Sequence, residues 1–185
     1  MICYLRTSAA SYDIRLRKYI SACQQSGTKY IAITWDRLLE CEPLGPEEIQ
    51  FKHKASYGLE YRKRNFLLYI GWIIFAFFHL IKERKRYKVI HACNVDTVLL
   101  AYVMGILFHK KIIFDIYDTS GKYTLERFFA KRSDIFILPH ELRSHQIGFN
   151  NYPDNLFVVE NVPYFQGYQP KNSQSYLDGK LHISY

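Results

Sequence analysis

The stretch VIHACNVDTVLLAYVMGILFHKKIIFDIYD, from Val89 to Asp118, contains two short apolar runs separated by a longer apolar segment. The runs at 89–93 and 111–117 are rich in β-branched and aromatic residues, as strands buried on both faces are. The segment 96–108 between them has the length of a helix. A strand, a helix and a second strand in this order predict two parallel strands joined by a right-handed crossover.

The same alternation continues on both sides of this unit. Further strands are predicted at 1–5, 30–35, 51–57, 135–138 and 156–159, and further helices at 9–23, 66–81, 125–132 and from about residue 141. The chain has 185 residues, of which 49% are hydrophobic, so it can bury one core but not the cores of two full α/β domains. We therefore expect one α/β domain with a Rossmann-like, doubly wound and mostly parallel sheet.

The formal net charge of +8 favours polyanionic partners such as nucleic acid, anionic lipid or a phosphorylated substrate. A nucleic-acid partner is disfavoured because the basic residues flank an apolar segment instead of alternating with aromatic residues, and no RNA- or DNA-binding motif is present. A dinucleotide-dependent enzyme is disfavoured because no G-x-G-x-x-G opens the first helix. The four cysteines form no CxxC pair and no cleavable signal is recognisable, which favours a cytoplasmic location.

The strand predicted at 89–93 contains His91 and Cys93, whose side chains point to the same face because strand residues alternate. In a sheet covered on both sides, that face usually meets a helix. A zinc site needs three or four converging ligands, and the sequence has no such spacing. We therefore expect both residues to belong to the core, and we expect no metal ion or other cofactor.

Polar residues follow both strands of the opening unit. The carboxyl ends of parallel strands form the ligand-binding edge of open α/β sheets, which places Asn94 and Asp96 at a functional position. Asp115 and Asp118 flank the end of the next strand. Asp96 is expected to cap the following helix by accepting backbone N–H bonds, whereas Asn94 and Asp118 suit either a capping or a binding role. The turn at 119–121 offers hydroxyl and backbone N–H groups to a sugar or a phosphate.

The apolar run from Phe66 to Ile81 has basic residues on both sides. The run is shorter than the roughly 20 residues that a membrane-spanning helix needs. It is either a helix that covers the sheet, with solvated basic flanks, or a helix that also lies on an anionic membrane surface, where each Lys or Arg contributes about 1 kcal/mol. The predicted membrane contacts are Arg62, Lys63, Arg64, Arg84, Lys85 and Arg86.

Five segments together carry a resemblance to a known family. These are YDIRLRKYISACQQSG (12–27), VIHACNVDTVLLA (89–101), KIIFDIYD (111–118), SDIFILPHELRSHQI (133–147) and VVENVPYF (158–165). In this order they resemble the N-terminal domain of GT-B glycosyltransferases, specifically the retaining group called family four or group 1. The first resembles the family's D-x-R helix that ends in glycine, and the last resembles the strand that precedes its interdomain linker.

The resemblance implies a retaining glycosyltransferase, in which the N-terminal half holds the acceptor and the C-terminal half holds the nucleotide-sugar donor, usually without a metal ion. Residues 1–165 would be the acceptor-side domain, and 166–185 would be the linker and the start of a donor-binding domain. The acceptor would be a glycan or a lipid-linked glycan, as in the assembly of surface polysaccharide or glycolipid. The protein would be cytoplasmic or peripheral on the inner face of the membrane, and the 185-residue chain alone would be inactive.

The resemblance also assigns site residues. Tyr117 stands where many members have the active-site histidine of the motif, and Asn94 stands where they have aspartate. The expected catalytic residues are Tyr117 and Asp118, and the expected acceptor-binding residues are Ser8, Ser11, Arg15, Asn94, Asp96, Thr119, Ser120 and Gly121. The alternatives are a non-catalytic or split-enzyme subunit at the membrane and, less favoured, a basic α/β module that binds nucleic acid.

Overall fold

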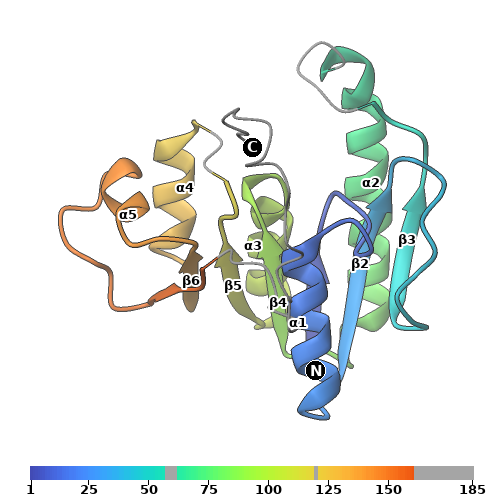
Figure 1. Cartoon of the computed structure of the whole chain (residues 1–185), viewed down its shortest axis with the longest axis horizontal. Coiled ribbons are helices and arrows are strands. Elements are labelled where there is room, and N and C mark those ends of the chain that lie inside the picture. The colour runs from blue at the N-terminus through green and yellow to red at the C-terminus, as the bar shows by residue number, and fades with distance from the viewer. Residues whose placement is uncertain (57–61, 119–120, 161–185) are drawn as a thin grey trace, which may run out of the picture.

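A computed structural model describes residues 1–56, 62–118 and 121–160, except for the side chains of 62–64. In this part of the chain seven strands form one sheet in the order β3-β2-β1-β4-β5-β6-β7, and every neighbouring pair is parallel (Figure 1). The strands are β1 (Ile2–Leu5), β2 (Tyr30–Asp36), β3 (Glu48–Lys52), β4 (Val89–Cys93), β5 (Lys111–Asp115), β6 (Ile135–Leu138) and β7 (Leu156–Val158). This confirms the predicted Rossmann-like fold.

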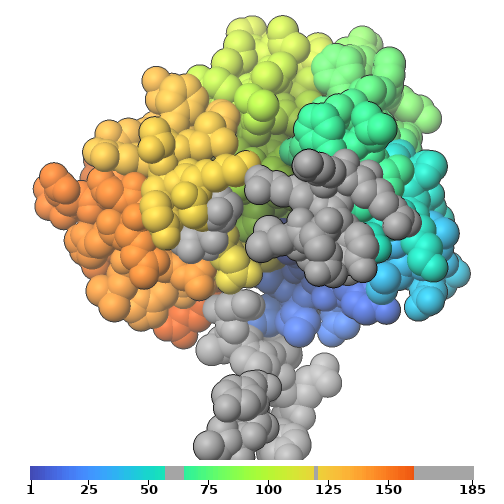
Figure 2. All heavy atoms as spheres, turned by 90° about the horizontal axis from the view of Figure 1, so that it is seen from above, coloured from blue at the N-terminus to red at the C-terminus, as the bar shows by residue number. Residues whose placement is uncertain are grey.

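The helices are α1 (Ile14–Gln25), α2 (Arg62–Glu83), α3 (Val95–Phe108), α4 (Tyr123–Ala130) and α5 (Arg143–Gln146). They cover the two faces of the sheet unequally. Leu16 and Ile20 of α1 pack with Tyr4 of β1 in a small cluster on one face. The main core on the other face contains buried residues of α2, α3 and α4, so these three helices share one layer (Figures 1 and 2).

Two predicted boundaries are wrong for identifiable reasons. The first helix begins at Ile14 instead of residue 9, because the Asp13 side chain accepts the Leu16 N–H at 2.8 Å and caps the helix there. The third strand is 48–52 instead of 51–57. It starts at Glu48, whose buried carboxylate accepts bonds from Thr34 Oγ1 and the Leu44 N–H. The hydrogen-bond donors that allow Glu48 to be buried lie elsewhere in the sequence, and a charged residue does not contribute to an apolar pattern. The start of β3 could therefore not be recognised from the sequence.

The other elements agree with the predictions more closely. The helix expected at 66–81 is longer in the structure, where α2 runs from Arg62 to Glu83. The strand expected at 111–117 ends at Asp115. The helix expected from about residue 141 is a single turn, α5. The linker predicted at 166–185 and the turn residues Thr119 and Ser120 lie outside the described residues, as do the side chains of Arg62, Lys63 and Arg64.

The carboxylate of Asp36, at the end of β2, organises the loop that follows it. The side chain is buried and accepts N–H bonds from Leu38, Leu39 and Cys41 at 2.9–3.2 Å. Burial by itself would raise the pKa of Asp36, but the Cys41 thiol and these three backbone groups hold that pKa below its ordinary value. The charged form is therefore the one that stabilises the fold.

Replacing Asp36 by asparagine is expected to lower the free energy of unfolding at pH 7 by about 2 kcal/mol or more, because an amide group would face the Cys41 N–H. A lowered folded-state pKa gives stability that is complete above the unfolded pKa of about 3.9 and is lost as the pH falls through the folded value. The difference between wild type and Asp36→Asn should therefore shrink below about pH 4.

Urea denaturation at pH 7 and at pH 3.5 measures this difference directly. Asp154→Asn, at an exposed carboxylate, serves as the matched control and should change stability little at either pH. A difference for Asp36→Asn that stays constant over this pH range would contradict the assignment.

Candidate functional site at the carboxyl edge of the sheet

The topological switch point of the sheet lies between β1 and β4. These two strands are parallel neighbours, but the chain leaves β1 toward α1 on one face and leaves β4 toward α3 on the other. Figure 2 looks onto this edge, with the blue amino-terminal segment on one side and the green and yellow helices on the other. Open α/β sheets bind ligands at such a point of divergence, outside the carboxyl ends of the strands.

A buried ion pair joins α1 to β5 beneath this edge. Arg15 donates from Nη2 to Asp115 Oδ1 at 2.7 Å and from Nε to Oδ2 at 3.1 Å, and the two side chains are 3% and 0% exposed. The Tyr19 hydroxyl donates to Asp115 Oδ2 at 2.7 Å, and His91 Nε2 lies 3.4 Å from the same oxygen. Burial alone would lower the pKa of Arg15, but the Asp115 carboxylate raises it above its ordinary value, so the guanidinium stays charged.

Tyr117, directly after β5, lies between two arginines. The guanidinium carbons of Arg6 and Arg15 are 4.4 and 4.9 Å from its ring centroid. Its hydroxyl donates to Cys93 Sγ at 3.3 Å. Burial raises the pKa of Tyr117 and of Cys93 well above their ordinary values, so both groups are neutral at pH 7. Neither is a phenolate or thiolate in this arrangement.

The loop after β1 is fixed to its neighbours by polar contacts. Arg6 Nε lies 2.5 Å from Asp13 Oδ2 and 3.2 Å from Ser8 Oγ. The Thr7 hydroxyl donates to Asp96 Oδ2, which ties the loop to the start of α3. The sequence prediction that Asp96 caps α3 is therefore wrong: the position before the helix is Asn94, and the Asp96 carboxylate accepts a hydroxyl from another loop. Its charge still suits the first turn of the helix.

Asn94 connects the ends of β4 and β5. Its Oδ1 accepts the Tyr117 N–H at 2.8 Å, and its own N–H donates to the Asp115 carbonyl at 2.7 Å. The residue has φ 75° and ψ 169°, a strained conformation outside the left-handed helical region. Two residues after Asn94, the Asp96 carbonyl accepts a hydrogen bond from the Tyr69 hydroxyl of α2. Burial raises the pKa of Tyr69 to about 12. Four elements thus meet at this point.

The structure brings together most of the predicted site residues at this edge. Arg15, Asn94, Asp96 and Tyr117 are linked by the contacts above, and Ser8 joins them through Arg6. The Ser11 hydroxyl is buried within the loop. Gly121 is exposed and has φ 75°. Whether any of these residues binds an acceptor stays a prediction.

Asp118 differs from the rest because its side chain is 87% exposed. Its Oδ1 lies 3.7 Å from Arg143 Nη2, and Arg143 Nη1 donates to the Tyr117 carbonyl at 2.8 Å. Of the two residues expected to be catalytic, Tyr117 is thus buried with its hydroxyl turned inward, whereas Asp118 presents its carboxylate to solvent. A substrate at this edge can reach the second group without any rearrangement.

The sequence predictions did not include several members of this cluster, namely Arg6, Thr7, Asp13, Tyr19, Tyr69 and Arg143, and they noted Asp115 only as flanking a strand end. Only one signal was available for them: Arg15 and Tyr19 have the i, i+4 spacing that brings side chains together on one helix face, and here Arg15 Nε donates to the Tyr19 hydroxyl at 3.1 Å. Arg6 contacts Ser8 and Asp13 within the same loop, where no regular spacing applies, and the remaining contacts join residues far apart in the sequence.

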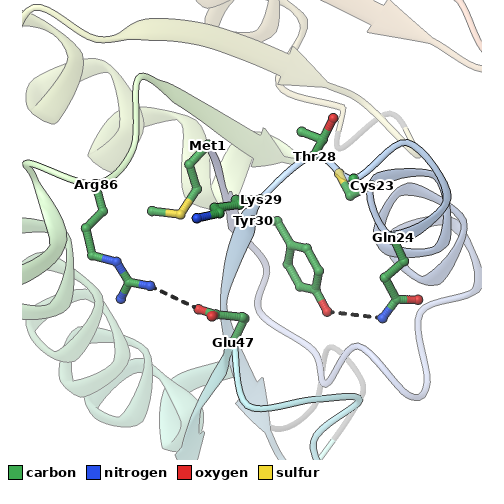
Figure 3. Close-up of a pocket in the computed structure, with 9 residues that line it drawn as sticks. Met1, Cys23, Gln24, Thr28, Lys29, Tyr30, Glu47 and Arg86 are labelled. Atoms are coloured by element: carbon green, nitrogen blue, oxygen red, sulfur yellow. Dashed lines mark hydrogen bonds and ion pairs between the residues drawn. The ribbon is translucent and has the colours of Figure 1, made fainter.

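His91 and Cys93 are buried, as predicted, with His91 packed against the rings of Tyr4 and Tyr19. Within residues 1–56, 62–118 and 121–160 no group of three or more His, Cys, Asp or Glu side chains is placed to hold a metal ion. A hollow of about 340 Å³ lies near the amino ends of β1 and β2, away from the carboxyl edge (Figure 3). Its lining includes Arg86, which pairs with Glu47.

No family model matches the chain, and no curated protein matches its sequence. Solved structures do match. The UDP-GlcNAc 2-epimerase from Methanocaldococcus jannaschii superimposes with a TM-score of 0.54 and 14% identity, over 86% of this chain and 45% of that one. HepE from Anabaena in complex with UDP gives 0.52 and 15% identity, over 86% and 43%. Another UDP-N-acetylglucosamine 2-epimerase gives 0.56 and 10% identity, over 85% and 47%.

The chain therefore spans less than half the length of each of these proteins. At such low identity the likeness establishes the fold alone, that of a Rossmann-like α/β domain.

Proposed function

We propose that the chain is the acceptor-side half of a two-domain, GT-B-like glycosyltransferase that transfers a sugar from a nucleotide-sugar donor to a glycan or a lipid-linked acceptor. The observation that carries the proposal is the convergence of the loops after β1, β4 and β5 at the switch point of the sheet. The similar solved structures support the class of chemistry, since HepE was solved with UDP and with UDP and glucose. The donor would be held by a second domain.

The chemistry of this edge suits positioning more than proton abstraction by a strong base. Tyr117 and Cys93 are neutral, and the Arg15–Asp115 pair is buried, with both oxygens of Asp115 accepting from the guanidinium. A retaining transfer relies on orientation of the two substrates and on electrostatic stabilisation of the leaving diphosphate. In this proposal the Asp118 carboxylate accepts a hydrogen bond from a hydroxyl of the acceptor sugar. The buried ion pairs hold the loops around this carboxylate in place.

Titration of the purified chain tests the proposal. NMR shift mapping with soluble glycans and with a short-chain prenyl diphosphate sugar is expected to perturb the amides around Asn94 and Asp118. UDP, UDP-glucose and UDP-GlcNAc are expected to bind only weakly, with Kd above about 1 mM. Asp118→Ala should weaken acceptor binding about tenfold, which corresponds to one lost hydrogen bond to a charged group.

Two controls make this titration decisive. Asp154→Ala removes an exposed carboxylate that lies two residues before β7, at the amino edge of the sheet. This change should leave acceptor binding unchanged. The exposed Asp118–Arg143 pair is worth at most about 1 kcal/mol, so Asp118→Ala should fold normally. Micromolar binding of UDP or a UDP-sugar to this edge would move the donor site into this domain and overturn the acceptor-side assignment. Interconversion of UDP-GlcNAc with its 2-epimer would favour an epimerase instead.

A further inference from the structure

The outward side of α2 is apolar along its length. The side chains of Phe66, Leu67, Ile70, Ile74 and Phe78 recur at helical spacing and are exposed, Leu67 to 75% and Phe78 to 63%. The opposite side of the same helix, with Trp72, Ala76 and Leu80, is fully buried in the main core. A water-facing helix surface normally carries polar residues opposite its buried stripe, and this one does not.

The apolar surface continues onto the neighbouring helices. α3 contacts both α2 and α4. Its outward residues Leu99, Val103, Ile106 and Leu107 are exposed, and so are Leu125 and Phe128 of α4. We call these eleven exposed side chains on α2, α3 and α4 the helical face. A contiguous apolar patch over three helices exceeds what isolated exposed residues produce and marks an interaction surface.

The helical face has a cationic border. Helices that connect parallel strands run back to the amino edge of the sheet, so α2, α3 and α4 all end there. Exposed basic residues gather at and after the ends of α2 and α4, namely Lys82, Arg84, Lys85, Lys88, Lys131 and Arg132. Of the three basic residues after α2 that the sequence assigned to membrane contact, Arg86 is engaged by Glu83 and Glu47, which leaves Arg84 and Lys85 as the better candidates.

We propose that the helical face docks on an anionic lipid bilayer, with α2 and α3 lying in the plane of the membrane surface. The apolar stripes enter the boundary of the acyl chains, and the cationic border meets anionic headgroups. Charge complementarity favours this partner over a second copy of the chain, because two copies would each bring a net charge of +8 to the contact.

The core contacts of α2 disfavour a spanning arrangement of this helix. By length and composition this helix could cross a membrane. Crossing would, however, pull Trp72, Ala76 and Leu80 out of the core that they share with β1, β2 and β4. Lying flat, α2 keeps its inner side on the sheet and places only its outer side in lipid.

The docked orientation sets the height of the carboxyl edge above the membrane. The sheet rests on the helical layer, so this edge opens sideways at about one helix diameter, roughly 10 Å, above the lipid surface. That is the level of a headgroup, which suits a lipid-linked acceptor; this last step rests on the proposed function, whereas the docking itself does not.

Flotation of the chain with vesicles of phosphatidylcholine, with and without 30 mol% phosphatidylglycerol, tests the docking. The vesicles carry no glycan, so the outcome is independent of any transferase activity. We expect at least tenfold stronger binding to the anionic vesicles. The double variant Ile74→Asp/Ile106→Asp should reduce that binding at least tenfold. Arg84→Glu/Lys85→Glu should remove most of the preference for anionic lipid.

Ile14→Asp is the matched control, because Ile14 is as exposed as Ile106 but lies on α1, on the other face of the sheet. It should bind vesicles like wild type. Circular dichroism and thermal unfolding establish that the variants fold. Wild type that stays unbound, or Ile74→Asp/Ile106→Asp that floats like wild type, would overturn the proposal. A lipid-free dimer in sedimentation that this double variant dissociates would overturn it too, in favour of a second copy on the helical face.

Discussion

Replacing Arg15 by alanine is expected to lower the free energy of unfolding by about 3–5 kcal/mol. The change would leave the Asp115 carboxylate, which is fully buried, without the guanidinium that now donates to both of its oxygens. A buried charge without its partner is far more costly than the net stabilisation that the pair itself provides. Urea denaturation at pH 7 measures the loss.

Two further variants separate charge from packing. Arg17→Ala changes an exposed arginine of the same helix and should alter stability by less than about 0.5 kcal/mol. Arg15→Met/Asp115→Leu removes both charges and should recover part of the loss, because no unpaired charge remains. If Arg15→Ala were within 1 kcal/mol of wild type, the ion pair would not be the element that holds α1 to β5.

The second large effect is expected at Tyr117. Tyr117→Ala should destabilise the fold by about 3 kcal/mol or more, because it empties a buried site and removes the ring on which Arg6 and Arg15 lie. Tyr117→Phe keeps the ring and loses only a hydroxyl that donates to Cys93 Sγ, a weak acceptor, so its cost should stay below about 1 kcal/mol. Urea denaturation of both variants provides the comparison.

The phenylalanine variant also distinguishes two roles for this residue. In the present geometry the hydroxyl is turned away from the edge, so Tyr117→Phe is expected to bind acceptor glycans as wild type does. A stable Tyr117→Phe protein that no longer binds the acceptor would show instead that the hydroxyl reaches the substrate, as the family resemblance implies.

The hydrophobic pattern along the sequence was sufficient to predict that helices and strands alternate. Residues 89–118 predicted β4, α3 and β5, because a strand buried on both faces has to be apolar at every position and its crossover helix must cover it. The same pattern failed for β3, which starts at a buried Glu48, and for the start of α1, where the Asp13 cap and not hydrophobicity sets the boundary. Boundaries set by polar contacts are the ones that periodicity cannot locate.

For the candidate site, the sequence indicated positions but not partners. The rule that ligands bind at the carboxyl ends of parallel strands correctly placed Asn94, Asp96 and Tyr117 at one edge. The prediction that Asp96 caps a helix was wrong, because its carboxylate accepts a hydrogen bond from the Thr7 hydroxyl. Thr7 lies 89 residues earlier in the chain, so no sign of this contact was present in the sequence. The basic flanks of α2 suited either a solvated helix end or a membrane surface, and only the packing showed that exposed apolar residues of α3 and α4 accompany those of α2.

The sequence by itself thus determined the α/β class, the parallel sheet and the edge at which polar residues gather, because periodicity and strand-end chemistry act over a few neighbouring residues. Only the tertiary structure decided which charges neutralise one another. Arg15 and Asp115 are 100 residues apart and meet because the sheet order places β5, which carries Asp115, only two strands from β1, which leads into α1. It also decided which apolar residues face the core and which face outward, since a helix that is apolar all round does not show in its sequence which side packs on the sheet.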